Sequence, residues 1–289
     1  MNFYYNKINI NYEIFEENAY EKNKCEENNN AENNCVGNKC VENSSETLNS
    51  TVPLLILHGW MARIEAMAPI YQYFKRNRKV IVLDFPGQGG ESDTLEEVWG
   101  VPEYAEMVKS LLDSLKIEKC DVIGHSFGGR IIIYLSSKYK NLFNKIVLTD
   151  AAGVKPKTSL KKLFKIYSYK IAKRIMRLTT PKEKYEEKLA EMRQKRGSSD
   201  YAMLTSNVMR ETFKKVINLD LTNKLKEIEQ PTLLVWGDKD TDTPLYMAKI
   251  MEKKIKDAGL VILENAGHFS YLDNPQKYLV IVETFLKNI

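Results

Sequence analysis

A chain of 289 residues, 43% hydrophobic and 10% aromatic, suits a globular protein with one domain plus additions, or with two small domains. The net charge of +5 is too small an excess to indicate a nucleic-acid partner. No window approaches 18 uninterrupted apolar residues, and the amino terminus lacks the basic start and apolar run of a signal peptide, so neither a membrane span nor secretion is expected. We therefore expect a cytoplasmic protein.

The first 50 residues predict a hairpin followed by an insertion. Residues 6–15 alternate Ile and Tyr with polar side chains, which is typical of a strand or hairpin, and we assign residues 1–15 to the core. Residues 16–50 are rich in Asn and Glu and hold almost no large apolar side chain, so we expect a disordered insertion. It contains Cys25, Cys35 and Cys40, but no close cysteine pair and no histidine. We expect free thiols there and at Cys120, and no metal site.

From residue 52 onwards, short apolar runs alternate with amphipathic stretches. The runs are rich in Val, Ile and Leu, as parallel strands buried on both faces are, and they lie at residues 53–57, 79–83, 120–123, 145–148, 232–236 and 260–263. Helical patterns occupy residues 102–115, 127–139, 245–255 and 275–286. This alternation predicts an α/β fold with a doubly wound, mostly parallel sheet, formed by residues 51–153 and 227–289.

The connection at residues 154–226 is too long for a structureless loop and predicts an inserted helical cap. It holds 20 Lys or Arg and seven Asp or Glu, so the basic excess of the chain is concentrated there. The basic amphipathic stretch at 160–178 could lie on anionic lipid. We favour a lid helix that turns its apolar face over the pocket. Met203, Met209 and Phe213 are candidate substrate-binding residues, with ordinary packing inside the cap as an equal alternative.

A G-x-S-x-G motif at residues 124–128 makes Ser126 the candidate nucleophile. It follows the strand at 120–123 and opens the helix at 127–139, so a sharp turn would lift the serine hydroxyl above the sheet edge. The flanking glycines permit this close approach, and the helix amino terminus favours developing negative charge. The alternative is a plain turn between strand and helix.

A serine hydroxyl needs a base, and the chain has three histidines. The side chain of His125 leaves the backbone beside Ser126 in another direction and should not reach the hydroxyl. His58 precedes the nucleophile, whereas His268 follows the last strand, at the edge where loops gather. We predict that His268 is the general base.

The acid that orients the histidine should leave another strand end, and residues 236–242 offer three aspartates. Asp238 directly follows the strand and is expected to be committed to the turn. Pro244 suits the first helical position, which leaves Asp242 beside a helix amino terminus in a structural role. Asp240 lies midway and is free to point towards the loop of His268.

The oxyanion of an acyl-transfer reaction needs two hydrogen-bond donors. We expect the backbone N–H of Phe127, next after the nucleophile, and that of Trp60, in the loop after the strand at 53–57. The glycines at 87–90 do not form G-x-G-x-x-G and do not open a clear helix, so no dinucleotide cofactor is expected.

With its motifs at residues 58–60, 84–92, 124–129, 236–244 and 267–268, the chain resembles the α/β-hydrolase fold family from residue 52 to its end. It departs from the family pattern in the Asn-rich insertion and in one extra residue between Gly89 and Ser92. Similar family members carry their acid at the G-x-x-D position of Asp240. The resemblance implies a cofactor-free serine hydrolase that cleaves a carboxylic ester or related acyl bond of a small molecule through an acyl-enzyme.

The resemblance leaves other activities open. An amidase, a carbon–carbon hydrolase or an acyltransferase would use the same residues. Relatives with an aspartate nucleophile are disfavoured by Ser126. A ligand-binding protein without catalysis is a further alternative, because the fold also serves as a receptor when a triad member is lost.

Overall fold

A computed structural model describes residues 1–16, 52–156, 160–181, 184–185, 187–189, 191–192, 201, 204 and 206–287. Within 160–181, side chains are described from residue 167 onwards. All but the first residue of the insertion expected at 16–50 lies outside the described residues, and so do its three cysteines and Met203. Cys120 is described, and it is a buried free thiol.

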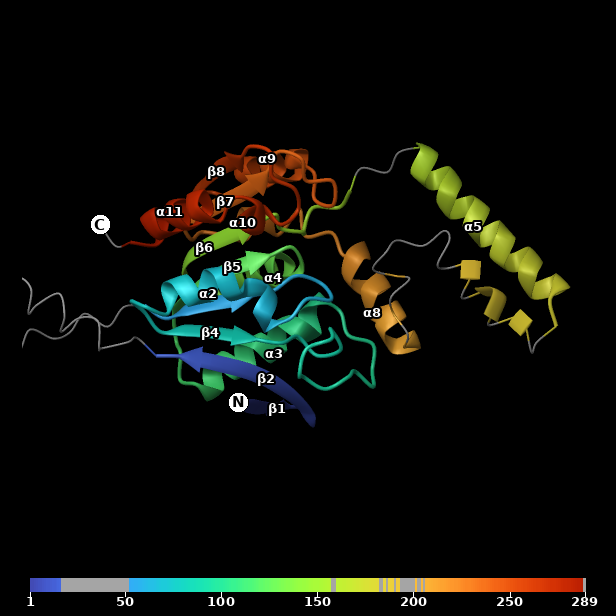
Figure 1. Cartoon of the computed structure of the whole chain (residues 1–289), viewed down its shortest axis with the longest axis horizontal. Helices are drawn as coiled ribbons and strands as arrows, with labels where there is room; N and C mark the ends of the chain where they lie inside the picture. Colours follow the sequence, from blue (N-terminus) through green and yellow to red (C-terminus); the bar gives the residue numbers. More distant parts are fainter. Residues whose placement is uncertain are drawn as a thin grey trace, which may run out of the picture.

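Eight described strands form one sheet in the order β1-β2-β4-β3-β5-β6-β7-β8 (Figure 1). They are β1 (Asn2–Tyr5), β2 (Ile8–Phe15), β3 (Leu54–Leu57), β4 (Val80–Leu83), β5 (Cys120–His125), β6 (Phe143–Thr149), β7 (Thr232–Gly237) and β8 (Ala258–Leu263). The first two pair antiparallel, β2 also runs antiparallel to β4, and the remaining pairs are parallel. The predicted α/β fold with a mostly parallel sheet is therefore confirmed.

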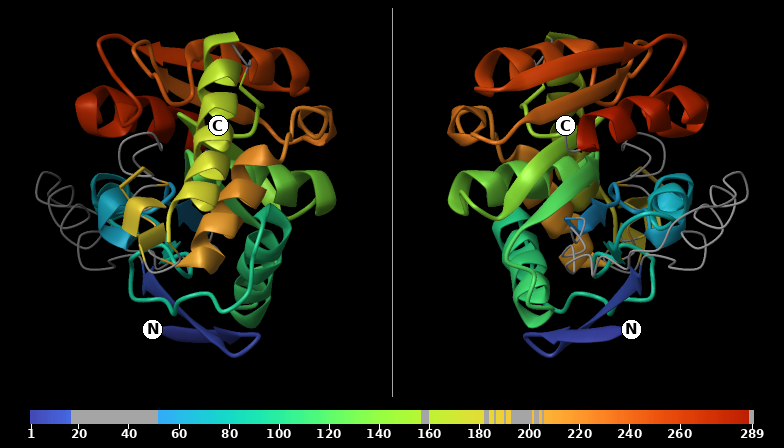
Figure 2. Two further views of the ribbon diagram at one scale, coloured as in Figure 1. Left: turned by 90° about the vertical axis from the view of Figure 1, so that its right-hand side faces the viewer. Right: turned by 90° about the vertical axis from the view of Figure 1, so that its left-hand side faces the viewer.

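Helices cover both faces of the sheet, which is why the central strands are apolar throughout (Figure 2). One face is covered by the 3-10 helix η1 (Ile64–Met67) and by α2 (Ala68–Phe74), α10 (Ser270–Asp273) and α11 (Pro275–Leu286). The other face is covered by α3 (Val101–Ser114), α4 (Phe127–Lys138), the 3-10 helix η2 (Leu225–Glu227) and α9 (Leu245–Lys254). Each face has its own hydrophobic core, and every residue of β3, β4, β5 and β7 is buried.

Two long helices lie between β6 and β7 in the chain, within the segment expected to form a cap. They are α5 (Leu160–Thr179) and α8 (Asn207–Asn218), and Figure 1 shows both beyond the carboxyl ends of the strands. The side chain of Ser206 accepts a hydrogen bond from the backbone N–H of Val208 and caps α8. This helix buries Met209, Thr212, Phe213 and Val216, which recur at helical spacing and face the core.

The lid expected at 160–178 falls on the outer helix α5. Four of its large side chains are exposed, namely Tyr167, Ile171, Ile175 and Leu178, whereas Tyr169 and Met176 are partly buried. The position over the sheet edge is taken by α8 instead (Figure 1).

Candidate active site

Ser126 lies in a sharp turn between β5 and α4, with φ 48° and ψ −106°. This conformation is rare for a residue with a side chain, and such strain is concentrated at functional sites. The turn is tight enough to require its glycines. A Cβ atom at Gly128 would overlap the carbonyl oxygen of Leu57, and one at Gly124 would overlap the side chain of Ile132. The backbone N–H of Ser126 donates to the carbonyl of Thr149 in β6, which anchors the turn to the neighbouring strand.

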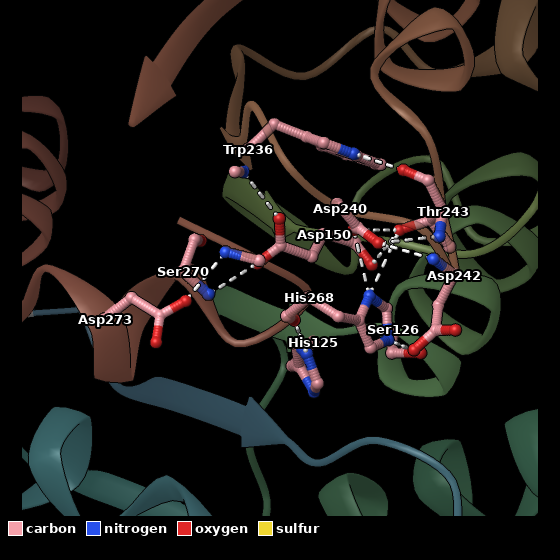
Figure 3. A network of polar contacts seen from close by, with 12 residues as sticks. His125, Ser126, Asp150, Trp236, Asp240, Asp242, Thr243, His268, Ser270 and Asp273 are labelled. Carbon is pink, nitrogen blue, oxygen red and sulfur yellow. Dashed lines mark hydrogen bonds and ion pairs between the residues drawn. The ribbon is translucent and has the colours of Figure 1, made fainter. Parts of the chain in front are cut away.

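The structure brings Ser126, His268 and Asp240 into one line of contacts (Figure 3). Nε2 of His268 lies 3.0 Å from Oγ of Ser126, and Nδ1 lies 2.9 Å from Oδ2 of Asp240. The three residues follow β5, β7 and β8, three parallel strands whose carboxyl ends meet at one edge of the sheet. His268 is thus within hydrogen-bond reach of the hydroxyl of Ser126, and Asp240 is within hydrogen-bond reach of His268.

Asp240 accepts hydrogen bonds at both carboxylate oxygens. Its Oδ1 accepts from the backbone N–H groups of Asp242, at 2.8 Å, and of Thr243, at 2.9 Å. The hydroxyl of Thr243 lies 2.6 Å from Oδ2. Burial opposes ionisation of Asp240, but the hydrogen bonds from His268 and Thr243 outweigh it and hold the pKa below its usual value.

The same pair shifts the pKa of His268 in the opposite direction. Burial lowers this pKa, whereas the hydrogen bond to Asp240 and its negative charge raise it, and the net result is a pKa above the usual value for histidine. An ionised Asp240 therefore stabilises the imidazolium form of His268, which is the form a general base takes after it accepts a proton.

The other two aspartates of the β7 turn do not contact His268 through their carboxylates. Oδ1 of Asp238 accepts a hydrogen bond, 3.2 Å long, from the backbone N–H of Ala266 and so links the two loops. Asp242 is exposed and contributes its backbone N–H to Asp240. The helix α9 begins at Leu245, with Pro244 just before it.

His125 and His58 are buried and do not contact Ser126. Nε2 of His125 lies 2.8 Å from the carbonyl oxygen of His268, and burial lowers the pKa of His125 to about 3. His58 accepts the backbone N–H of Phe85 at Nε2, so its Nδ1 carries the proton donated to Gly59. Burial lowers the pKa of His58 as well, and both rings support the loops as neutral groups. Among the described residues, no group of His, Cys, Asp or Glu is arranged to hold a metal ion.

Sequence reasoning missed Asp150, a buried carboxyl group directly after β6. Its Oδ1 accepts the backbone N–H of Gly237, at 2.9 Å, and its Oδ2 accepts that of Ser270, at 3.0 Å (Figure 3). Burial raises the pKa of Asp150 to about 7. The one signal in the sequence was a carboxylate at the end of a strand adjacent to the strand of Ser126.

The predicted oxyanion residues lie side by side. The rings of Trp60 and Phe127 are 5.3 Å apart and nearly perpendicular, and the ring of Phe213 in α8 lies 5.3 Å from that of Trp60. In the part of the chain that the structure describes, neither backbone N–H of Trp60 and Phe127 donates to another group. Met209 packs closely on Gly87, where an added Cβ atom would lie 2.5 Å from its Sδ. Met209 thus packs on the loop after β4 and Phe213 packs on Trp60, whereas Met203 lies outside the described residues.

The amino-acid sequence matches a known protein family. Residues 54–280 match the sequence profile of the alpha/beta hydrolase family, which covers well over half of the chain. The chain belongs to this family. As an alpha/beta hydrolase it is an enzyme, as the sequence predicted, and its fold and family resemblance are both confirmed.

Similar proteins are distant in sequence but cover most of the chain. Monoacylglycerol lipase ABHD6 of Homo sapiens is 21% identical over 254 residues, which are 82% of this chain and 75% of the lipase. The AB hydrolase superfamily protein YisY of Bacillus subtilis is 26% identical over 253 residues, 81% of this chain and 91% of its own. The enol-lactonase from Burkholderia xenovorans LB400 has a similar structure, with a TM-score of 0.68, 16% identity and full coverage of both chains.

Proposed function

We propose that this protein is a serine hydrolase that cleaves a carboxylic ester of a small molecule through an acyl-enzyme intermediate. The observation that carries the proposal is the unbroken chain of contacts from Oγ of Ser126 through His268 to Asp240. This is the arrangement that activates a hydroxyl for nucleophilic attack, recognised by its geometry and not by position in the sequence.

In the proposed first half of the reaction, Oγ of Ser126 attacks the ester carbonyl while Nε2 of His268 takes the hydroxyl proton. The backbone N–H groups of Trp60 and Phe127 donate to the oxyanion of the tetrahedral intermediate, and the amino terminus of α4 adds a favourable field. The intermediate collapses when His268 protonates the leaving alcohol, which leaves the acyl group on Ser126.

In the second half, water attacks the acyl-enzyme and His268 acts first as base and then as acid. The proton taken from the water returns to Oγ of Ser126, and the carboxylic acid departs. Asp240 stays ionised throughout, because its two oxygens accept four hydrogen bonds. The donors are the backbone N–H groups of Asp242 and Thr243, the hydroxyl of Thr243 and Nδ1 of His268. It holds the imidazole in the tautomer with a free Nε2 lone pair.

An ester is favoured over other acyl bonds by the relatives, since one is named a monoacylglycerol lipase and another an enol-lactonase. An amidase, a carbon–carbon hydrolase and an acyltransferase would share the first half-reaction. A panel of esters, lactones and amides of matched acyl groups separates these activities by kcat/KM, and added alcohols reveal acyl transfer.

Ser126→Ala is the decisive variant. We expect a loss on the order of 10⁵–10⁶ in kcat on activated esters, as for removal of the nucleophile in other triads. A fluorophosphonate probe should label the native chain at Ser126 and leave the variant unlabelled. Ser114→Ala, in α3, serves as the matched control and should keep both properties. Retention of a tenth of the activity by Ser126→Ala would reject the proposal.

A further inference from the structure

The helix α5 (Leu160–Thr179) is the outermost element of the described chain beyond the carboxyl ends of the strands (Figures 1 and 2). The shorter α8 lies between it and the sheet, and α8 contacts the site through Met209 and Phe213. One long face of α5 is therefore turned away from the body of the protein.

The most exposed side of α5, as far as its side chains are described, is apolar. Spacings of four, four and three residues place its members on one side of the helix, and all are more than half exposed, namely Tyr167 (59%), Ile171 (60%), Ile175 (54%) and Leu178 (81%). We call these four residues the apolar stripe. The partly buried described positions of the helix are Ser168, Tyr169, Ala172 and Met176. Four large side chains of the described part of α5 thus expose apolar area that burial would stabilise.

The stripe is bordered by positive charge. The 20 residues of α5 include seven Lys or Arg and no Asp or Glu. At 100° per residue, Lys170, Arg174 and Arg177 lie next to the stripe, and Lys173 lies farther around the same side; all four are exposed. None of them forms an ion pair with a described residue, while the ammonium group of Lys170 lies 5.8 Å from the ring of Tyr167. An apolar face with basic residues beside it is the pattern of a helix that lies in a membrane interface.

We propose that the apolar stripe and its basic border form a docking surface for a membrane that contains anionic lipid. The stripe would enter the boundary between headgroups and acyl chains, and the basic residues would contact lipid phosphates. No described helix meets the length and apolarity of a transmembrane span. A second copy of this helix is disfavoured as the occupant, because it would bring the same unbalanced positive charge against the first.

Docking in this way turns the edge of the sheet that carries Ser126 towards the lipid, because α5 lies on the side of the strands' carboxyl ends (Figure 1). The binding itself requires no chemistry at Ser126, so it is tested independently of the proposed reaction.

The experiment is co-sedimentation of the full chain with vesicles of phosphatidylcholine alone and of phosphatidylcholine mixed with phosphatidylglycerol, over a series of NaCl concentrations. We expect at least about tenfold tighter binding to the anionic vesicles at low salt, because each nearby basic side chain contributes about fivefold. This preference should vanish in molar salt. Equal affinity for the two vesicle types at low salt overturns the proposal.

Matched variants separate the stripe and its border from the rest of the surface. Ile171→Ser should weaken binding to both vesicle types, whereas Val280→Ser, in α11 and equally 60% exposed, should not. The pair Lys173→Glu and Arg174→Glu should abolish the anionic preference. The pair Lys253→Glu and Lys254→Glu, at the exposed end of α9, makes the same change in charge and should retain it.

Circular dichroism and hydrolysis of a water-miscible ester verify that each variant is folded. Tyr167→Trp provides a second measurement, and its fluorescence should shift to the blue on anionic vesicles. Wild-type binding by Ile171→Ser refutes the role of the stripe. Light scattering tests for a dimer. If the native chain is a dimer and Ile171→Ser dissociates it, the surface binds a second copy, and the proposal is likewise refuted.

Discussion

Asp150 accepts a hydrogen bond, 3.0 Å long, from the backbone N–H of Ser270, two residues beyond His268. Its other oxygen accepts from Gly237, at the start of the turn that carries Asp240. One buried carboxyl group thus fixes the two loops that bring Asp240 and His268 together. It touches neither Ser126 nor the expected position of the substrate, so Asp150 is a positioning residue.

Asp150→Asn should therefore lower both stability and turnover. Above pH 7, where Asp150 is ionised, the carboxylate offers two acceptors and the amide only one, so one buried backbone N–H loses its partner in the variant, at about 1–3 kcal/mol. Urea unfolding and kcat on one ester measure the two effects. Asp273→Asn is the matched control, because Asp273 also accepts a backbone N–H of the histidine loop, at Gly267, but at an exposed position. Equal losses in the two variants would contradict the special role of Asp150.

Asp150 also contributes to the dependence of stability on pH. Its pKa is raised by burial to about 7 in the folded protein, above the usual value for aspartate in the unfolded chain. Between these values the folded state holds a proton that the unfolded state has lost. The contribution of this group to stability is therefore complete at acid pH and is lost as pH rises to about 7. Asp150→Asn should remove this part of the pH profile of the unfolding free energy.

Asp240→Asn tests which aspartate orients His268. The amide would present the wrong group to Nδ1 and disturb the tautomer, so kcat should fall on the order of 10³–10⁴. Asp238→Asn keeps the acceptor for Ala266, and Asp242→Asn keeps the backbone N–H used by Asp240, so each should cost less than about tenfold. Kinetics on all three variants, with circular dichroism as the test of folding, decides among them. If Asp242→Asn loses most of its kcat while Asp240→Asn keeps a nearly normal kcat, the assignment of Asp240 is wrong.

The pH profile of the native enzyme follows from the same contact. In the proposed mechanism His268 must be neutral to accept a proton, and Asp240 raises the pKa of this histidine above its usual value. The rate constant kcat/KM should therefore rise with pH and level off only above that raised pKa. The variant Asp240→Asn lacks this negative charge, so the midpoint of the rise in its remaining kcat/KM should move to lower pH. An unchanged midpoint in this variant would mean that Asp240 does not set the titration of His268.

Features of this chain that depend on neighbouring residues could be predicted from the sequence, whereas contacts between distant segments could not. The strands at the sheet centre were predictable because burial on both faces makes a run such as Leu54–Leu57 uniformly apolar. The contact between Ser126 and His268 was predictable because each residue lies next to a strand end, and because the chain has only three histidines. Asp150 carries no local pattern, since its partners come from turns 87 and 120 residues away. The packing of α5 was also beyond a single-sequence pattern, because periodicity defines an apolar face but not what covers it.

Met209 should influence substrate length through its position in α8. It is buried against Gly87 in the loop after β4, while Phe213, one helical turn further on, packs on Trp60. Met209→Ala opens space at the edge of the site, so kcat/KM should change unequally across esters of increasing acyl length. Val216→Ala, a buried residue of the same helix, is the matched control for packing alone. An equal change at all lengths in both variants would mean that Met209 only supports the cap.

Gly128→Ala tests whether the turn of Ser126 depends on close approach of the backbone. Gly128 has no positive φ, so the substitution adds no conformational strain, and its effect comes from overlap of the new Cβ with the carbonyl oxygen of Leu57. Relieving the overlap must move the start of α4 and with it Ser126. Overpacking of this kind costs about 1–3 kcal/mol, and the displaced hydroxyl should lose most of its activity.

Gly259→Ala, in β8, is the control for the general effect of replacing glycine. Its added Cβ meets no atom within 4 Å, and its φ is not positive. This variant should keep full activity and gain about 0.4–1 kcal/mol, because alanine reduces the entropy of the unfolded chain. Urea unfolding and kcat on a short ester distinguish the two variants. If Gly128→Ala retains wild-type turnover and stability, the turn is looser than the contacts with β3 indicate, and the position of Ser126 does not depend on that glycine.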